Sequence, residues 1–132
     1  IIEDSFYGRT EKESKVIGYA LDNAQMYFDG KCIFSQVDYD VLHKYGVGSK
    51  DLSAIVSQLK LVKGIEVAVF NYPGTAGGVK VSLRSTKKVN VCEIASVFGG
   101  GGHNLAAGCT IDDSFEGAKE KILDEVWKKL ND

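Results

Sequence analysis

The stretch IEVAVFNYPGTAGGVKVSLRS, residues 65–85, decides the fold of this chain. Its first part, residues 65–71, is a run of β-branched and aromatic residues, and its second part, residues 79–85, alternates apolar and polar residues. Pro73-Gly74 and Gly77-Gly78 supply turn chemistry between the two parts. The stretch therefore predicts two strands joined by a turn.

The second of these strands is predicted to have one apolar and one polar face. Successive side chains of a strand point to opposite sides, so Val79, Val81 and Leu83 share one face. The polar face carries Lys80, Ser82 and Arg84. The planar guanidinium of Arg84 suits a bidentate phosphate contact, although an ordinary exposed strand cation is the simpler alternative.

Upstream, the sequence predicts three helices and a hairpin. Thr10 and Glu13 form a capping-box pattern, so a helix is expected near 11–24. Asp29-Gly30 lies between two short apolar segments, Met26–Phe28 and Lys31–Val37, which is typical of a hairpin. A short helix is expected over Asp38–Tyr45 and closed by Gly46, followed by a helix that Ser49 begins and Leu59 ends.

Downstream, Asn90 is expected to cap a helix near 91–98, with Glu93 completing a capping box. A glycine run follows, then a short segment over 103–107 stopped by Gly108, and a last short strand over 109–111. Asp113 or Ser114 should cap a terminal helix whose apolar positions recur at helical spacing. Helices and strands alternate without a strict βαβ repeat. The prediction is a single α+β domain, with a mixed sheet of about five strands and helices packed against it.

Composition limits the class of ligand. The 132 residues carry a net charge of −2, which argues against a long nucleic-acid groove. Between Val67 and Ile111, however, the sequence has four cationic residues and a single acidic one, Glu93. The net charge of this segment is therefore +3, and that of the rest of the chain is −5. A local cationic segment in an acidic chain favours a small anionic ligand. A chance patch on a solvated face is the alternative.

The three cysteines, Cys32, Cys92 and Cys109, show no Cys-x-x-Cys spacing and sit beside apolar neighbours. We interpret them as reduced thiols of a cytoplasmic protein, and a zinc site is not expected. The sequence has no apolar run of the roughly 20 residues that a membrane span needs.

The glycine run Gly99, Gly100, Gly101 and Gly102, ending in His103, is the most unusual local feature. Glycines permit positive φ and let backbone N–H groups converge on an anion, and a following helical turn would add its own N–H groups. The histidine can donate hydrogen bonds to a phosphate. The run fits neither a Walker loop nor a dinucleotide fingerprint. A plain flexible loop is the alternative.

Three other polar residues are candidates for a site or for a structural role: Ser85, Asn90 and His43. Ser85 and Asn90 are neutral hydrogen-bonding groups near Arg84 in sequence, although a helix cap fully explains Asn90. His43 lies in a polar helix and is interpreted as a surface residue.

Three blocks, in this order and spacing, carry a family resemblance: Ser82-Leu83-Arg84-Ser85, Val89-Asn90-Val91, and Phe98-Gly99-Gly100-Gly101-Gly102-His103 with Ala106-Ala107-Gly108. Together they resemble the DHH-associated C-terminal domain of DHH phosphoesterases. The chain is most similar to the nanoRNase branch, whose members degrade short oligoribonucleotides and often dephosphorylate phosphoadenosine phosphate. The upstream stretch from Thr10 to Phe70 is similar to that branch as well.

The resemblance implies a two-domain enzyme. In the family, a separate N-terminal domain with an Asp-His-His motif holds two divalent metal ions, usually manganese, and this chain has no such motif. The chain begins with Ile1-Ile2 rather than Met, so we expect a piece of a longer protein. The resemblance implies that residues 1–9 are the end of the interdomain connector and that 10–132 are the substrate-binding domain. The family pattern implies no catalytic residue and no metal ligand here. It implies substrate contacts from Arg84, Ser85, Asn90, Gly99, Gly100, Gly101, Gly102 and His103.

The expected function is therefore substrate recognition for a cytoplasmic, metal-dependent phosphoesterase acting on short oligonucleotides. Its expected partners are a short oligonucleotide or nucleotide phosphate and its own N-terminal domain, with no membrane. One alternative is a nucleic-acid-binding module like the C-terminal domain of alanyl-tRNA synthetases. Another, within the same superfamily, is a cyclic-dinucleotide phosphodiesterase or a single-strand exonuclease.

Overall fold

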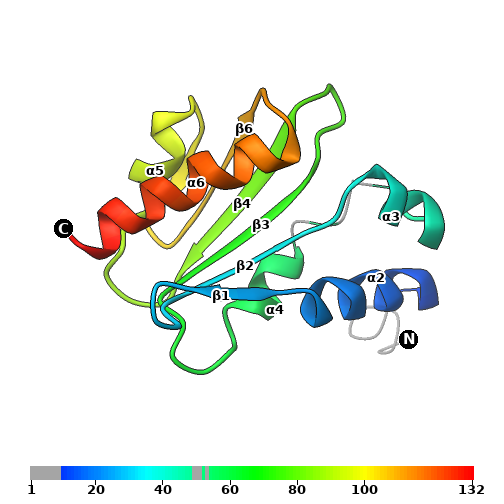
Figure 1. Cartoon of the computed structure of the whole chain (residues 1–132), viewed down its shortest axis with the longest axis horizontal. Coiled ribbons are helices and arrows are strands. Elements are labelled where there is room, and N and C mark those ends of the chain that lie inside the picture. Colours follow the sequence, from blue (N-terminus) through cyan, green and yellow to red (C-terminus); the bar gives the residue numbers. More distant parts are fainter. Residues whose placement is uncertain (1–9, 49–51, 53) are drawn as a thin grey trace.

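A computed structural model describes residues 10–48, 52 and 54–132 of the chain. In these residues, strands and helices are interleaved along the sequence (Figure 1). The helices are α2 (Glu11–Asp22), α3 (Tyr39–Tyr45), α4 (Ile55–Leu59), α5 (Val91–Val97) and α6 (Phe115–Leu130). The strands are β1 (Gln25–Tyr27), β2 (Cys32–Gln36), β3 (Val67–Pro73), β4 (Val79–Ser85), β5 (Gly101–His103) and β6 (Ala106–Ile111).

The six strands form one mixed sheet in the order β1-β2-β3-β4-β6-β5. The β2–β3 pair is parallel, and the other four pairs are antiparallel. The parallel pair is joined by a crossover that contains α3 and α4, as a parallel connection requires. The predicted α+β mixed sheet is confirmed, with one strand more than the expected five.

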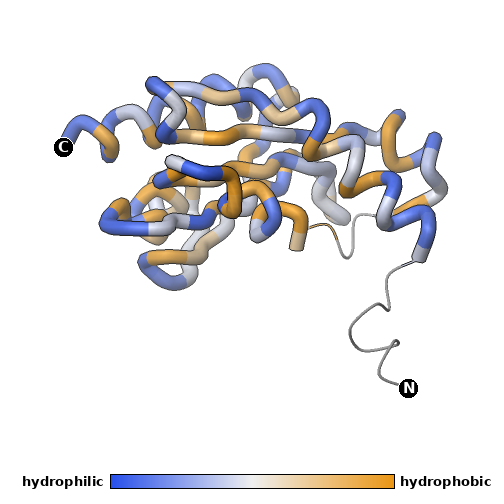
Figure 2. The backbone as a smooth tube through the Cα atoms, turned by 90° about the horizontal axis from the view of Figure 1, so that it is seen from below, coloured by the Kyte–Doolittle hydropathy of each residue, from blue (hydrophilic) through white to orange (hydrophobic). Residues whose placement is uncertain are grey.

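Helices pack on both faces of the sheet (Figure 1). α5 and α6 cover one face, where Val81, Leu83, Ile94 and Ile122 belong to one buried cluster. On the other face, α2, α3 and α4 pack over β2 and β3, and this second cluster contains Phe70. In Figure 2, the apolar parts of the trace run mainly through the inside of the molecule, and hydrophilic parts mark its ends and turns. Within the described ranges, every helix is too short or too polar to span a bilayer.

The helix ends follow the predicted caps. Thr10 and Glu13 form the capping box of α2, with the Glu13 amide donating to Thr10 Oγ1 at 3.1 Å. Asp38 caps α3, which Gly46 ends in a left-handed conformation with φ of 66°. Ser114, rather than Asp113, caps α6.

Three local predictions need correction. The α4 helix begins at Ile55 and is shorter than expected, and the predicted cap Ser49 lies outside the described residues. Glu93 does not complete a capping box, because its carboxylate instead accepts from Lys129 Nζ and from Asn90 Nδ2. The short segment predicted over 103–107 and the last strand predicted over 109–111 are parts of one hairpin, in which β5 (Gly101–His103) pairs with β6 (Ala106–Ile111). Residues 1–9, predicted to end a connector, also lie outside the described residues.

Candidate ligand-binding face of the sheet

The polar face of β4 lies on the side of the sheet that α5 and α6 leave uncovered. Ser82 pairs with Phe70 and Arg84 with Ala68 in the β3–β4 register, and Phe70 and Ala68 belong to the core cluster on the α4 side. Cross-strand partners share a face, so Lys80, Ser82 and Arg84 point to this side. The predicted alternation of β4 is confirmed.

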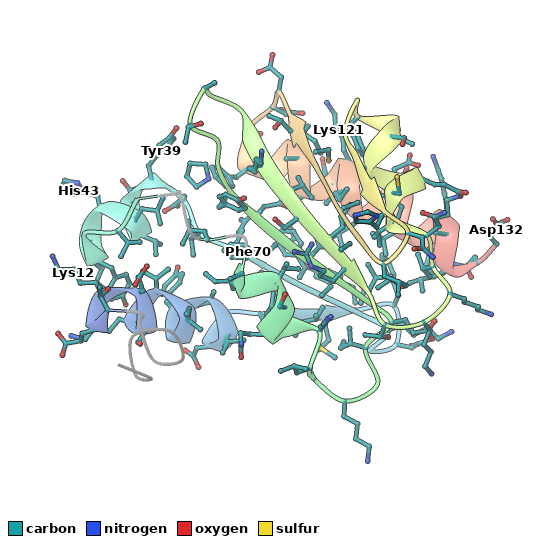
Figure 3. The ribbon with its side chains drawn as sticks, turned by 180° about the vertical axis from the view of Figure 1, so that it is seen from behind. Lys12, Tyr39, His43, Phe70, Lys121 and Asp132 are labelled. Atoms are coloured by element: carbon teal, nitrogen blue, oxygen red, sulfur yellow. The ribbon has the colours of Figure 1, made fainter. Side chains whose placement is uncertain are left out.

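The β5–β6 hairpin extends this surface beyond β4. His103 pairs with Ala106, and Ala106 pairs with Arg84, so the three residues form one cross-strand row. A second row contains Gly101, Gly108 and Ser82. Viewed from behind, β4, β6 and β5 lie beyond the edge of α4, with α6 on their far side (Figure 3). We call this surface the open face; it comprises Lys80, Ser82, Arg84, Gly101, His103, Ala106, Gly108 and Thr110.

The first row places two hydrogen-bond donors on either side of a small residue. Neighbouring strands lie about 4.8 Å apart, so the Cα atoms of Arg84 and His103 are separated by roughly 10 Å across Ala106. His103 is exposed and Arg84 is half-buried. One guanidinium nitrogen of Arg84 donates to the Leu83 carbonyl at 2.8 Å, which leaves other N–H groups of the fork for a ligand. Between these two side chains, Ala106 presents only a methyl group.

The second row gives the open face a flat floor. Gly101 and Gly108 present no side chain, and Ser82 is only 6% exposed. A Cβ added at Gly101 would meet no atom within 4 Å, and its φ is not in the left-handed region. Neither packing nor backbone conformation requires glycine at this position. The absence of a side chain at Gly101 therefore affects how closely a ligand can approach the sheet, and not the folding of the chain.

The first half of the glycine run closes helix α5. Gly99 has a φ of 81° and donates its amide hydrogen to the Ser96 carbonyl at 3.1 Å, and Gly100 donates to the Ala95 carbonyl at 2.9 Å. These two bonds are the Schellman motif that commonly ends a helix. Both amides therefore already have partners, and the predicted cradle of successive free N–H groups is not formed by Gly99 and Gly100.

Two glycines of the run are needed for close backbone approach. A Cβ at Gly100 would collide with the Gly108 carbonyl oxygen and come within 2.6 Å of Cys109 Cβ. A Cβ at Gly102, whose φ is 143°, would lie 2.6 Å from the Ala106 carbonyl oxygen. Glycine at these positions lets β5 pack against β6 and carry His103 onto the open face. The run thus positions the site as well as contributing to it.

The structure does not bring Ser85 and Asn90 onto the open face. Ser85 pairs with Val67, whose side chain belongs to the core under α5 and α6, so Ser85 points away from Arg84. It is 3% exposed, and its buried hydroxyl has no hydrogen-bond partner. The predicted ligand contact through Ser85 is therefore inconsistent with its placement. Asn90 is a helix cap: its Oδ1 accepts from the amides of Cys92 and Glu93.

Five residues of the open face were not among the predicted site residues: Ser82, Ala106 and Gly108, and the pair Lys80 and Thr110. Both are exposed and lie in one row with Tyr72. The alternation of β4 already placed Lys80 beside Ser82 and Arg84, so the pattern contained this information. No comparable alternation in the sequence around Thr110 indicated that it lies on this face. His43 is exposed on α3, at the opposite side of the molecule from β5 (Figure 3).

Two of the three cysteine thiols are buried in the core, and the third is half-buried. Burial raises the pKa of the Cys32 thiol to about 12, and burial raises that of Cys109 to about 11 while the Lys80 charge acts in the opposite direction. Cys92 is half-buried and its Sγ donates to the Gly102 carbonyl at 3.5 Å. Across residues 10–48, 52 and 54–132, no three His, Cys, Asp or Glu side chains gather as a metal site.

The chain matches known proteins along most of its length. The family model described as the DHHA1 domain matches residues 29–132. The chain is 29% identical over 130 residues to the bifunctional oligoribonuclease and PAP phosphatase NrnA of Thermus thermophilus, and the match covers 98% of this chain but 38% of that protein. The chain thus spans well under half the length of this relative.

Solved structures share the fold. An exopolyphosphatase-related protein from Bacteroides fragilis superposes with a TM-score of 0.87 at 25% identity, covering 96% of this chain and 38% of that one. The pGpG-specific phosphodiesterase PggH from Vibrio cholerae gives a TM-score of 0.60 at 14% identity, covering 87% and 39%. The second likeness is one of fold alone.

Proposed function

The chain belongs to the DHHA1 domain family, and from this premise we propose that it is the substrate-binding part of a metal-dependent phosphoesterase acting on short oligonucleotides. The similarity to an oligoribonuclease and PAP phosphatase supports this substrate class, with phosphoadenosine phosphate as a second substrate. The proposal assigns this chain the task of holding the substrate phosphate and presenting it to a catalytic domain.

The row of Arg84, Ala106 and His103 is the observation that carries the proposal. A guanidinium and an imidazole on either side of a methyl group can both donate to one phosphate, and charge-assisted hydrogen bonds are the stronger kind. Beside this row, Gly101 and Gly108 let the ligand approach the sheet closely. We propose that the phosphate is held by these side chains and by the flat floor, rather than by a nest of glycine amides.

The catalytic centre is proposed to lie on a separate N-terminal DHH domain. The described residues do not gather the carboxylate and histidine ligands that a two-metal centre needs, so this part of the chain does not fit such a centre. We propose that the two metal ions, manganese by family resemblance, are bound by that other domain. Incubation of this chain alone with manganese and a dinucleotide should then give no hydrolysis. Hydrolytic activity that copurifies with this chain would contradict the proposal that the catalytic centre lies on a separate domain.

A binding experiment tests the proposal against the nucleic-acid module. About two or three phosphate contacts imply a shallow dependence of affinity on salt, with a slope of roughly −0.7 per contact for single strands. A 5′-phosphorylated dinucleotide and a long single-stranded RNA should be titrated by calorimetry at several salt concentrations. Similar affinities with shallow slopes support the proposal. Much tighter binding of the long strand, with a steep slope, would favour the module instead.

A further inference from the structure

Lys80 lies on the open face but outside the phosphate seat between Arg84 and His103. It is exposed, and it stands four residues before Arg84 on the same strand and the same face. Antiparallel strands rise about 3.4 Å per residue, so the Cα atoms of the two cations are roughly 14 Å apart. Within the described ranges, the structure records no carboxylate within ion-pairing distance of Lys80. Its charge is therefore available to a ligand.

The surface between the two cations suits an extended ligand. Ser82 stands between them on β4, and its neighbour on β6 is Gly108. Ser82 is only 6% exposed, so a ligand anchored over Ala106 would pass beside it, over Gly108, which has no side chain, and the exposed Thr110. Beside Lys80 on β3, its cross-strand partner Tyr72 is 6% exposed and stacks on Phe70 with ring centroids 5.4 Å apart, so Tyr72 is packed into the core at this end of the face.

The cationic residues elsewhere in the same segment do not share this geometry. Lys87 and Lys88 lie in the exposed bend after β4, beyond the end of the sheet row. Lys88 lines a different hollow, together with Glu66, Glu93 and Lys129. Lys80, in contrast, shares the open face with Arg84 and His103 and lies four residues along β4 from Arg84, at a right angle to the row that joins Arg84 to His103.

We propose that Lys80 is a second phosphate anchor that sets the length of the preferred ligand; this rests on the proposed function. A stacked single strand advances about 3.4 Å per nucleotide, and an extended one advances further. A span of roughly 14 Å therefore corresponds to about two to four steps between phosphates, that is, about three extended to five stacked nucleotides. A 5′-mononucleotide held by Arg84 and His103 does not reach Lys80, whereas the backbone of a trinucleotide reaches it in an extended conformation.

Lys80→Gln tests this anchor, with Lys88→Gln as the matched control. Titrations of each variant should use AMP and a 5′-phosphorylated triadenylate. Lys80→Gln should leave AMP affinity unchanged, weaken the trinucleotide about three- to tenfold, and reduce its salt slope by about 0.7, the value for one lost contact. Lys88→Gln should change none of these quantities.

Arg84→Ala separates failure of the anchor from failure of the proposed function. If Arg84→Ala weakens both ligands while Lys80→Gln behaves as the unaltered chain, the phosphate seat stands and the anchor is refuted. If Arg84→Ala leaves both ligands unaffected, the proposed function itself is overturned. Equal losses from Lys80→Gln with both ligands would mean that Lys80 acts only through diffuse charge, which also overturns the anchor.

Discussion

The amide of Gly100 donates a hydrogen bond of 2.9 Å to the carbonyl oxygen of Ala95, the residue that begins the last turn of α5. This bond ties the glycine run to the helix before it, and the pairing of Gly101 with Gly108 ties the run to the strand after it. The run is therefore a fixed connection between two packed elements. Because β5 is held in this way, His103 stands opposite Ala106 and in line with Arg84.

Arg84→Ala should weaken binding of a short phosphorylated ligand far more than Lys88→Ala. Loss of a hydrogen bond to a charged group costs about 1.5–3 kcal/mol, whereas an exposed cation that makes no direct contact contributes much less. Calorimetric titration with a dinucleotide measures both variants. Equal losses would indicate that only diffuse charge attracts the ligand, and the assignment of Arg84 would then be wrong.

His103→Ala should weaken binding of a short phosphorylated ligand about tenfold. The imidazole stands in one row with Arg84 and can donate a hydrogen bond to a phosphate there, and loss of a hydrogen bond to a charged group costs about 1.5–3 kcal/mol. Calorimetric titration with a dinucleotide measures the loss. His43→Ala, on the other side of the molecule, is the control and should behave as the unaltered chain. Unchanged affinity in folded His103→Ala would remove the histidine from the proposed site.

The elements defined by local chemistry could be predicted from the sequence, and the hairpin that completes the site could not. Thr10, Asp38 and Asn90 cap their helices through neighbouring amides, so sequence alone contains the information. Strand β5 consists of Gly101, Gly102 and His103, and glycine has no intrinsic preference for strands. This strand exists only because it pairs with β6, which is a tertiary contact.

The same distinction applies to the site residues. Arg84 was predictable because alternation along β4 fixes its face. The alternation also excludes Ser85 from that face, although family resemblance had grouped the two residues. The use of the Gly99 and Gly100 amides in a Schellman motif depends on where α5 ends, and helix ends are uncertain by one or two residues even in known structures.

Alkylation should distinguish the three thiols in the folded chain. Only the thiolate reacts, and burial holds the pKa of Cys32 at about 12 and that of Cys109 at about 11. Iodoacetamide at pH 8 should therefore label Cys92 first, and the other two only after unfolding in guanidinium. Mass spectrometry of peptides from a time course measures the order. Labelling of Cys32 as fast as Cys92 would contradict the described core.

Asn71→Leu should raise the free energy of unfolding by about 1 kcal/mol. Asn71 is fully buried, and neither Nδ2 nor Oδ1 has a hydrogen-bond partner, so an apolar side chain of similar shape removes a desolvation cost. Ser35→Ala is the control: its buried hydroxyl donates to the Ala20 carbonyl at 2.6 Å, and its loss should destabilise. Urea denaturation measures both. A less stable Asn71→Leu would mean that this amide is satisfied, for example by an internal water.

Gly101→Ala should reduce affinity for a short phosphorylated ligand at least tenfold, about 1.4 kcal/mol, while the domain stays folded. A Cβ at Gly101 meets no atom within 4 Å, and its φ suits alanine, so stability should change little. The methyl group would, however, stand on the open face beside the row of Arg84 and His103, where the ligand must approach. Gly100→Ala is the matched comparison, because its Cβ collides with Gly108 and Cys109 and should destabilise by about 1–3 kcal/mol. Thermal melts establish which variant is folded, and calorimetric titration then gives affinity per folded molecule. Unchanged affinity in folded Gly101→Ala would show that the ligand does not approach this face, and the proposed binding mode would fail with it.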